Sequence, residues 1–328
     1  MFNLISIGDI VIDTHVQIDN ASLECQIKDR PCQLCMEYAG KIPIKKSWQS
    51  LGGNASNVAV GARKLGLTTA IISSIGNDAN GNMAIEKLNE LKVNTDYIFK
   101  EEKNETRYSI VLNFQTERTI LSFHKKRKYV WPKNMPETEW IYYTGLSDGF
   151  KKIKTSMLRW LKKNPETHLA INPGSFQMKK YPDEVRDCTK YADIFLVNLQ
   201  EAEKILGITL KQEKNISTLL RGLLNLGAKE VVITDGNKGA YVADMEEIWQ
   251  MQSFPIKVVA KTGAGDAFSA GYISARCQGY NKPQALRWGI ANSCGVIAKV
   301  GAQNGLLTTP QIKRMLGKYS NIKPILIS

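Results

Sequence analysis

The sequence predicts an α/β fold with a large, mostly parallel central sheet, and three observations support this prediction. Short apolar segments of strand length alternate with helical segments along most of the 328 residues, which is the pattern of a parallel sheet covered by helices. Near the C-terminus, a glycine-rich turn separates a strand-like segment from a helix-like one. With 43% hydrophobic residues, the chain has ordinary globular composition and can bury a sizeable core.

Each predicted strand is a short apolar run that ends at turn residues. The first covers Phe2–Ile7 and the second Ala70–Ile75. Between them we expect a helix over Ser56–Leu65, with Asn54 or Ser56 as its cap. The same pattern predicts later strands, each followed by a helical stretch, at Trp140–Tyr143, His168–Ile171, Ile194–Val197 and Val231–Thr234.

Two regions interrupt this alternation. Residues 14–50 alternate loosely between polar and apolar, and residues 107–123 contain two strands around Gln115-Thr116-Glu117. We expect both regions to leave the main sheet and to form a small β lid. Because the sequence contains no flexible linker and no internal repeat, we predict one domain over residues 1–328, with the lid as part of it.

The formal charge of +13 admits several anionic partners, because a positive field concentrates nucleic acid, membrane lipid and small anions alike. The densest basic run, Lys125–Lys128, is interpreted as a solvated face. No apolar run approaches the ~18 residues of a membrane span, and the first residues lack a signal sequence. We therefore expect a cytoplasmic protein without a membrane partner.

The six cysteines are too scattered for a secreted disulfide framework, so free thiols are expected. Cys25, Cys32 and Cys35 include one Cys-x-x-Cys pair. A structural zinc site needs four ligands, and no second pair follows. Metal binding by these three cysteines is left open.

The strongest chemical signal is the turn Lys261-Thr262-Gly263-Ala264-Gly265-Asp266, which follows the strand-like segment Ile256–Ala260 and precedes a helix of small residues. Glycines let backbone amides converge on one group of oxygens, and the start of a helix favours an anion such as phosphate. Asp266 fits two roles there. It is a helix cap, or it is a general base that accepts a proton from an attacking hydroxyl beside the anion site.

The turn and its helix resemble the C-terminal signature of the PfkB, or ribokinase-like, carbohydrate kinases. A second stretch, Leu51–Gly66 (LGGNASNVAVGARKLG), resembles the N-terminal signature of the same family, about 200 residues earlier and in the right order. Weaker similarities to that family extend the resemblance over nearly the whole chain, at Ile7–Asp13, Ala170–Gly174, Asn198–Glu203 and Thr234–Ala240. The resemblance implies a three-layer α/β/α fold with a mostly parallel sheet and a β-strand lid.

The resemblance also assigns roles to individual residues. It implies that Asp266 is the base, with the amides of Gly263, Ala264 and Gly265 as the anion hole. Glu201 is expected to hold Mg²⁺ through water, since magnesium sites use few protein ligands. Substrate contacts are expected from Asp13, Gly52, Gly53 and Asn57. Nucleotide contacts are expected from Asn198, Thr234, Gly236, Gly239, Lys261, Thr262 and Asn292.

One departure from the family pattern concerns the residues before the glycine turn. Many relatives carry an aspartate there that helps to bind an activating monovalent cation, whereas this chain has Ala260-Lys261-Thr262. The Lys261 ammonium can stand in for that cation, or it can point to solvent. We expect a weak or absent requirement for potassium.

These observations predict a kinase that uses ATP and Mg²⁺ to phosphorylate a hydroxyl of a sugar, as ribokinases and fructokinases do. A nucleoside kinase, a sugar-phosphate kinase and a catalytically silent ligand- or nucleic-acid-binding relative remain as alternatives. The expected partner is a small sugar or nucleoside and not nucleic acid. Association of two copies through the lid is the expected assembly.

Overall fold

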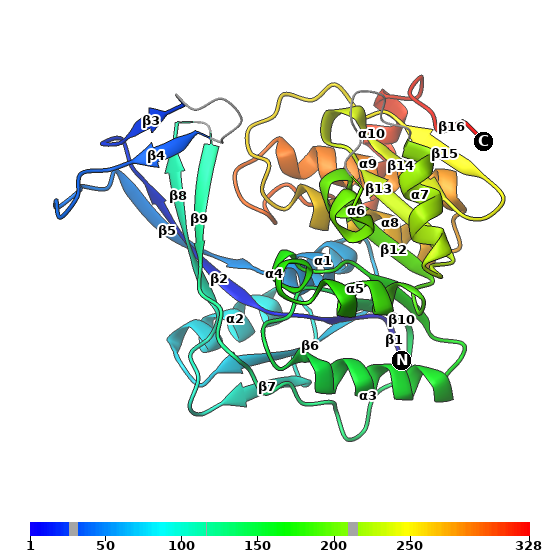
Figure 1. The fold of residues 1–328 in the computed structure, drawn as a ribbon, viewed down its shortest axis with the longest axis horizontal. Coiled ribbons are helices and arrows are strands. Elements are labelled where there is room, and N and C mark those ends of the chain that lie inside the picture. Colours follow the sequence, from blue (N-terminus) through cyan, green and yellow to red (C-terminus); the bar gives the residue numbers. More distant parts are fainter. Residues whose placement is uncertain (26–31, 116, 209–215) are drawn as a thin grey trace.

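A computed structural model of the protein describes residues 1–25, 32–115, 117–208 and 216–328. Its largest sheet runs through the middle of the molecule (Figure 1). In spatial order, its ten strands are β16 (Ile325–Leu326), β15 (Ile248–Met251), β14 (Ala240–Ala243), β13 (Glu230–Thr234), β12 (Ile194–Asn198), β11 (His168–Ile171), β10 (Thr138–Tyr143), β1 (Phe2–Ile7), β6 (Thr69–Gly76) and β7 (Ile98–Glu101). The strands from β13 to β7 pair in parallel, and β14, β15 and β16 pair antiparallel at one edge.

Helices cover both faces of this sheet (Figure 1). One face packs against α3 (Phe150–Lys163), α5 (Pro182–Thr189), α6 (Leu199–Leu206) and α7 (Ile216–Asn225). The other packs against α1 (Asn54–Lys64), α8 (Ala264–Cys277), α9 (Lys282–Ile297) and α10 (Thr309–Lys318). Two shorter or peripheral helices, α2 (Ala79–Glu90) and α4 (Ser175–Lys180), and the 3₁₀ turn η1 (Gly236–Lys238) complete the helical elements of the described residues.

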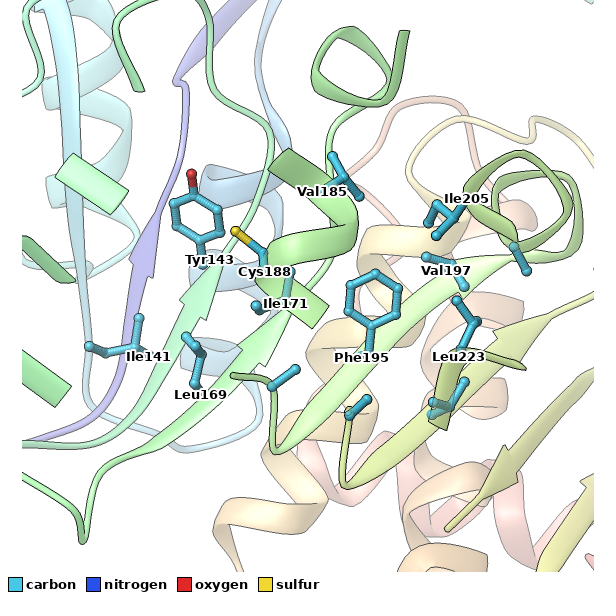
Figure 2. Packing of buried hydrophobic residues seen from close by; sticks show 14 of the residues in the cluster. Ile141, Tyr143, Leu169, Ile171, Val185, Cys188, Phe195, Val197, Ile205 and Leu223 are labelled. Atoms are coloured by element: carbon cyan, nitrogen blue, oxygen red, sulfur yellow. The ribbon is translucent and has the colours of Figure 1, made fainter. Parts of the chain in front are cut away.

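The parallel strands are apolar along nearly their whole length because both of their faces are covered. β6 is buried at every position, as expected for a strand between two helical layers. Figure 2 shows one of the resulting cores, where Phe195 of β12 packs among side chains of the neighbouring strands and of α5, α6 and α7. The predicted α/β architecture with a mostly parallel central sheet is confirmed.

A second sheet projects from one end of the molecule (Figure 1). We call it the lid sheet; its strands, in spatial order, are β5 (Lys46–Gly52), β2 (Val11–Gln17), β8 (Tyr108–Phe114) and β9 (Glu117–Ser122). A separate hairpin joins β3 (Ser22–Glu24) to β4 (Gln33–Cys35). The lid sheet therefore starts at Val11 and extends to Gly52, slightly beyond the interval of residues 14–50 expected for the first lid segment.

The expectation of free thiols was wrong for two cysteines. Cys25 and Cys32 form a disulfide with their Cα atoms 4.3 Å apart. The hairpin explains this, because Glu24 pairs with Gln33 and the next two positions outward are Cys25 and Cys32. Cys35, Cys188, Cys277 and Cys294 are free thiols. The described residues contain no group of three or more potential metal ligands.

The segment Ile256–Ala260 is not a strand, which corrects a second expectation. It forms no ladder, and the amides of Val259 and Ala260 instead both donate to the carbonyl of Ile297 at the end of α9, at 2.7 and 3.2 Å. Val258 and Val259 are about half exposed, at 51% and 47%. Their apolar character resembles that of a strand, but no described strand of the central sheet pairs with them. Among the described helices, none is both long and apolar enough to cross a membrane.

Candidate active site

A polar cavity of about 200 Å³ opens where the parallel strands β11, β12 and β13 end and α8 begins. This is the usual position of ligand sites in open α/β sheets. Of the residues singled out in the sequence, those that line the cavity are Asn198, Glu201, Thr234, Lys261, Gly263, Ala264, Gly265 and Asp266.

The glycine turn places free backbone amides at the cavity. Gly263 has a left-handed backbone with φ of 77°, and a Cβ there would lie 2.6 Å from the Cβ of Ala302. The amide of Ala267 makes a bond of 2.8 Å to the carbonyl of Gly263. Because helical bonding starts at Ala267, the amides of Ala264 and Gly265 have no partner within the helix. A side chain at Gly265 would meet open space, so the turn is open on the cavity side.

Asp266 lies in the first turn of α8 and is not its cap, since Gly263 occupies the cap position. Its Oδ2 accepts a hydrogen bond of 2.7 Å from the side chain of Asn57. Burial raises the pKa of Asp266 to about 6, and hydrogen bonds from Asn57 and Asn54 act in the opposite direction. The carboxyl group therefore loses its proton just below neutral pH.

The amide of Asn57 is fixed on both sides. Its nitrogen donates to Asp266, and its oxygen accepts a bond of 2.9 Å from Gln303. Gln303 also donates to the carbonyl of Leu51 at 3.2 Å. Asn57 therefore connects α1 to α8 and to the segment that follows α9.

The start of α1 differs from the sequence expectation. The helix begins at Asn54, and its cap is Gly53, which makes no side-chain capping bond. Neither Asn54 nor Ser56 caps the helix, because the side chain of Asn54 bonds to Asp266 instead and Ser56 is buried. Gly53 has φ of 92°, and a Cβ would lie 2.4 Å from the carbonyl oxygen of Asp9. This position requires glycine.

Asp13 lies on β2 beside Gly52, where a Cβ would approach the Asp13 carboxylate to 2.3 Å. Burial raises the pKa of Asp13, while a hydrogen bond from Ser109 and the charges of Arg107 and Arg118 lower it. Its charge also raises the pKa of Asp266. The two carboxylates are therefore close enough to interact electrostatically.

Asn198 and Glu201 face the cavity as a reciprocal capping box at the start of α6. Asn198 Oδ1 accepts from the Glu201 amide, and Glu201 Oε2 accepts from the Asn198 amide, each at 2.9 Å. Burial raises the pKa of Glu201, and the charge of Asp266 contributes to the same direction. A magnesium ion held mainly by water fits this set, because one acidic side chain lines a polar cavity beside the predicted anion turn.

The remaining predicted nucleotide residues divide into two groups. Thr234 lines the cavity, and Gly236 and Gly239 form the turn just after it, with φ of 54° and 96°. Asn292 lies apart from the cavity. It is fully buried, with its nitrogen bonded to the Ala267 carbonyl at 2.7 Å and its oxygen to the Leu307 amide at 2.9 Å.

Lys261 and Thr262 precede the glycine turn, and Lys261 lines the cavity. The Lys261 ammonium forms an ion pair of 3.0 Å with Glu117, the first residue of β9. Both side chains are about two-thirds exposed, at 66% and 68%. This contact joins the lid sheet to the glycine turn.

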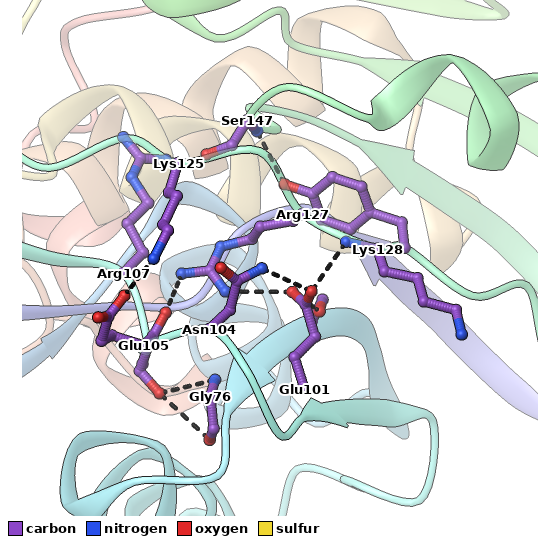
Figure 3. A network of polar contacts seen from close by, with 12 residues as sticks. Gly76, Glu101, Asn104, Glu105, Arg107, Lys125, Arg127, Lys128 and Ser147 are labelled. Atoms are coloured by element: carbon purple, nitrogen blue, oxygen red, sulfur yellow. Dashed lines mark hydrogen bonds and ion pairs between the residues drawn. The ribbon is translucent and has the colours of Figure 1, made fainter.

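A second polar network, which the sequence did not predict, lies where β1 leads into the lid sheet, and Figure 3 shows its part around Glu101 and Arg127. The buried carboxylate of Asp9 accepts from Arg107 at 2.9 Å, from Ser147 at 2.7 Å and from the Tyr129 hydroxyl. The buried Arg127 contacts Glu101 nearby. Asp9 directly follows the first strand at a glycine, which was the only sequence signal for it.

Comparison with known proteins agrees with this geometry. The chain matches the pfkB family carbohydrate kinases over residues 19–309. It is 27% identical to an ATP-dependent 6-phosphofructokinase of Thermoanaerobacterium thermosaccharolyticum, over 80% of this chain and 84% of that protein. It is 25% identical to a nucleoside kinase of Methanocaldococcus jannaschii, over 85% and 89% of the two chains.

Solved structures share the fold at low identity. An Arabidopsis thaliana ribokinase complexed with ribose and ATP matches with a TM-score of 0.77 and 21% identity, over 96% of this chain and 98% of that one. The Methanocaldococcus jannaschii nucleoside kinase matches with a TM-score of 0.76 and 21% identity, over 97% and 99%. These likenesses confirm the predicted ribokinase-like fold.

The fold and the family match define a kinase that transfers a phosphoryl group to a hydroxyl of a sugar or nucleoside. The chain belongs to the pfkB family of carbohydrate kinases. The predicted family and enzyme class are confirmed, and the catalytically silent alternative is not supported.

Proposed function

We propose that this kinase transfers the γ-phosphoryl group of ATP to a hydroxyl of a sugar, with Asp266 as general base. The observation that carries the proposal is the position of Asp266, next to free backbone amides and lining the same cavity as Glu201. Phosphoryl transfer depends on positioning and charge stabilisation, and this arrangement supplies both. A nucleoside or a sugar phosphate is the alternative acceptor.

Asp266 takes the proton from the accepting hydroxyl as that oxygen attacks. Its pKa of about 6 suits this role, because the group is ionised at neutral pH yet basic enough to accept a proton. Asn57 and Asn54 orient the carboxylate by hydrogen bonding. Asp13, on the lid sheet, binds other hydroxyls of the sugar, and the backbone of Gly52 and Gly53 contributes further contacts. The absence of a Cβ at Gly52 leaves room for the Asp13 carboxylate beside it.

The amides of the turn at Gly263, Ala264 and Gly265 bind the oxygens of the transferring phosphoryl group, where negative charge accumulates. Asn198, Thr234, Thr262 and the turn at Gly236–Gly239 hold the nucleotide. Glu201 holds Mg²⁺ through water, and the ion neutralises phosphate charge when bound. Asn292 is left out of these contacts, because it is fully buried and does not line the cavity.

The Lys261 ammonium replaces a monovalent cation beside the phosphate turn. Its position on the cavity wall supports this role. We expect the rate to change less than about twofold between 100 mM KCl and 100 mM tetramethylammonium chloride, whose cation is too bulky for a potassium site. A many-fold rise with potassium would disprove the replacement. Dimerisation through the lid sheet stays a prediction.

The test is a panel of sugars, nucleosides and sugar phosphates assayed for ADP release with MgATP, followed by Asp266→Asn. Turnover of at least one acceptor by the wild type, lost in Asp266→Asn with binding retained, supports the proposal. Asp187→Asn is the matched control, since Asp187 is a half-exposed residue of α5 that pairs only with Lys190 among the described residues. Equal turnover by Asp266→Asn and wild type would exclude Asp266 as the base.

A further inference from the structure

The Arg118 side chain makes no hydrogen bond and no ion pair with a residue that the structure describes, although the charges of Glu117 and Asp13 act on it. It is the least exposed residue of β9. Its Nε is closed off from solvent and has no hydrogen-bond partner. Four other arginines share this feature, but each of them makes a contact through another guanidinium nitrogen: Arg107, Arg127, Arg276 and Arg287. The adjacent carboxylate of Glu117 is already paired with Lys261 at 3.0 Å. Buried polar groups are nearly always hydrogen-bonded, so this guanidinium requires an explanation.

Strand register places Arg118 on the same face of the lid sheet as Asp13. Asp13 pairs with Ser109 of β8, which pairs with Ser122 of β9. These three paired residues form one row across the sheet. Four residues further along β2, another row is formed by Gln17 of β2, Asn113 of β8 and Arg118 of β9. Since side chains alternate between the faces of a sheet, positions an even number of residues apart lie on one face. The charge of Arg118 indeed acts on Asp13.

The row of residues between Asp13 and Arg118 is largely buried and presents aromatic rings. The row between them contains His15, which is 4% exposed, stacks on Trp48 with ring centroids 4.8 Å apart, and bonds to Ser50 at 3.0 Å. His15 Nδ1 is buried without a partner. Rows four residues apart are separated by about 13 Å, which two side chains and a five- or six-carbon sugar can fill.

A second arginine lies at the base of the same face but differs in its pairing. Arg107 bonds to the buried carboxylate of Asp9 at 2.9 Å and to His124 Nε2 at 2.9 Å. Burial and the charge of Arg107 lower the pKa of His124 to about 4, so His124 adds no charge. Arg107 is therefore ion-paired with Asp9, whereas Arg118 forms no ion pair with a described residue.

We infer that Arg118 binds an anionic group of the acceptor, so that the substrate is a sugar bearing a carboxylate or a phosphate. The sugar hydroxyls then face Asp13, and the anionic end extends toward Arg118. A guanidinium forms paired hydrogen bonds with either anion. This inference rests on the proposed function and selects the acidic sugars among its acceptors.

The test compares acceptors that differ in charge: glucose with gluconate, and fructose with fructose 6-phosphate, with adenosine as a neutral nucleoside. Initial rates of ADP release give kcat and KM for each. We expect at least one anionic acceptor to exceed its neutral partner in kcat/KM by about 30-fold or more, the usual effect of a charge-assisted hydrogen bond. The pair with the larger ratio distinguishes carboxylate from phosphate.

Arg118→Met is expected to reduce that ratio to about threefold or less by raising KM for the anionic acceptor, with kcat preserved. Arg118→Lys should retain part of the preference, because it keeps the charge but not the paired geometry. Arg159→Met, at an exposed position of α3, is the control for loss of one positive charge and should leave the ratio unchanged. Thermal unfolding of each variant checks that the lid sheet is intact.

A binding measurement tests the contribution of Arg118 to acceptor affinity independently of turnover. Isothermal titration of the anionic acceptor into Asp266→Asn, with and without Arg118→Met, should show the same loss of affinity as the KM values. Higher affinity or faster turnover for the neutral acceptors would overturn the inference and leave the kinase function intact. So would a ratio unaffected by Arg118→Met. If no acceptor is phosphorylated, the proposed function fails and this inference with it.

Discussion

The glycine turn and the lid sheet differ in how firmly each holds its charged side chain. Asp266 is held by two asparagines and by the first turn of a buried helix. Arg118 lies on a strand whose other residues are exposed, and no described residue forms a hydrogen bond with its side chain. Catalytic groups must be held close to their reactive geometry, whereas a recognition group can receive its final partner from the substrate. Under the proposed function, the packed core performs the chemistry and the lid sheet selects the acceptor.

Of the substitutions around the glycine turn, Asp266→Asn is expected to lower activity the most. Loss of the base should lower kcat by about 10²- to 10⁴-fold, the range for general-base catalysis. KM for the acceptor should change little, because binding lies mainly with the lid sheet. Steady-state kinetics give both constants. A large rise in KM with unchanged kcat would mean that Asp266 binds the substrate rather than reacting with it.

The pH dependence of kcat/KM should reflect the same carboxylate. Because the pKa of Asp266 is about 6, the free enzyme carries a protonated, inactive base below that value and an active one above it. We expect kcat/KM to fall about tenfold for each pH unit on the acid side. An acceptor whose own charge is constant over this range serves as the control. A profile that is flat between pH 5 and 7 would contradict this role.

Asn57→Ala is expected to shift the fall of kcat/KM at low pH to a higher pH. Asn57 donates to the ionised carboxylate and so lowers its pKa. Without this bond, the midpoint should move from about 6 toward about 7. Activity at pH 6 should therefore fall more than activity at pH 8. Asn82→Ala, on the exposed side of α2, is the matched control. Equal losses at both pH values would indicate a structural effect alone.

Asp266→Asn should also stabilise the protein at pH 7.5, by about 2–4 °C in Tm. The raised pKa means that the folded chain binds this proton more tightly than the unfolded chain. Wild-type stability therefore decreases as pH rises through about 6, and asparagine removes this decrease. At pH 5, which lies between the ordinary value of 3.8 and the folded value of about 6, the gain should fall to about half, because the unfolded carboxyl is already ionised there while the folded one is still mostly protonated. Calorimetry at the two pH values measures the difference.

Glu117→Gln should give the smallest effect, because exposed ion pairs contribute little. It removes the contact between β9 and Lys261, and we expect a change in KM for ATP of less than about threefold with unchanged Tm. Glu105→Gln, which breaks the exposed pair with Lys125, is the control. A tenfold change in kcat would show that this contact is more than a surface ion pair.

Much of the fold follows from short-range sequence pattern. Strands such as Phe2–Ile7 and His168–Ile171 agree with the structure to the residue, because a buried strand is apolar along its length. The segment Ile256–Ala260 has the same composition but forms no ladder. Pattern alone does not reveal whether a free sheet edge is available to receive such a segment.

The candidate site was predictable where a motif fixes the backbone, as at Gly263 and Asp266. It was less predictable where contacts join distant segments. Asn54 was expected to cap α1 but bonds to Asp266, and Gln303 holds Asn57 across 246 positions. The disulfide between Cys25 and Cys32 depends on the hairpin register. Such pairings come from tertiary geometry, which local composition does not encode.

The buried anchoring of Asp9 has a mechanical consequence. The chain passes directly from β1 of the central sheet through Asp9 into β2 of the lid sheet, and Arg107, Tyr129 and Ser147 hold Asp9 at that junction. At the far end, the described residues hold the lid sheet to the rest of the molecule only weakly, through the exposed ion pair of Glu117 with Lys261. When that pair opens, the sheet is fixed at its Asp9 end alone, and displacement increases with distance from that end. Asp13 lies near the fixed end and Arg118 near the far end. Bending would therefore barely move Asp13 and would carry Arg118 through the widest arc.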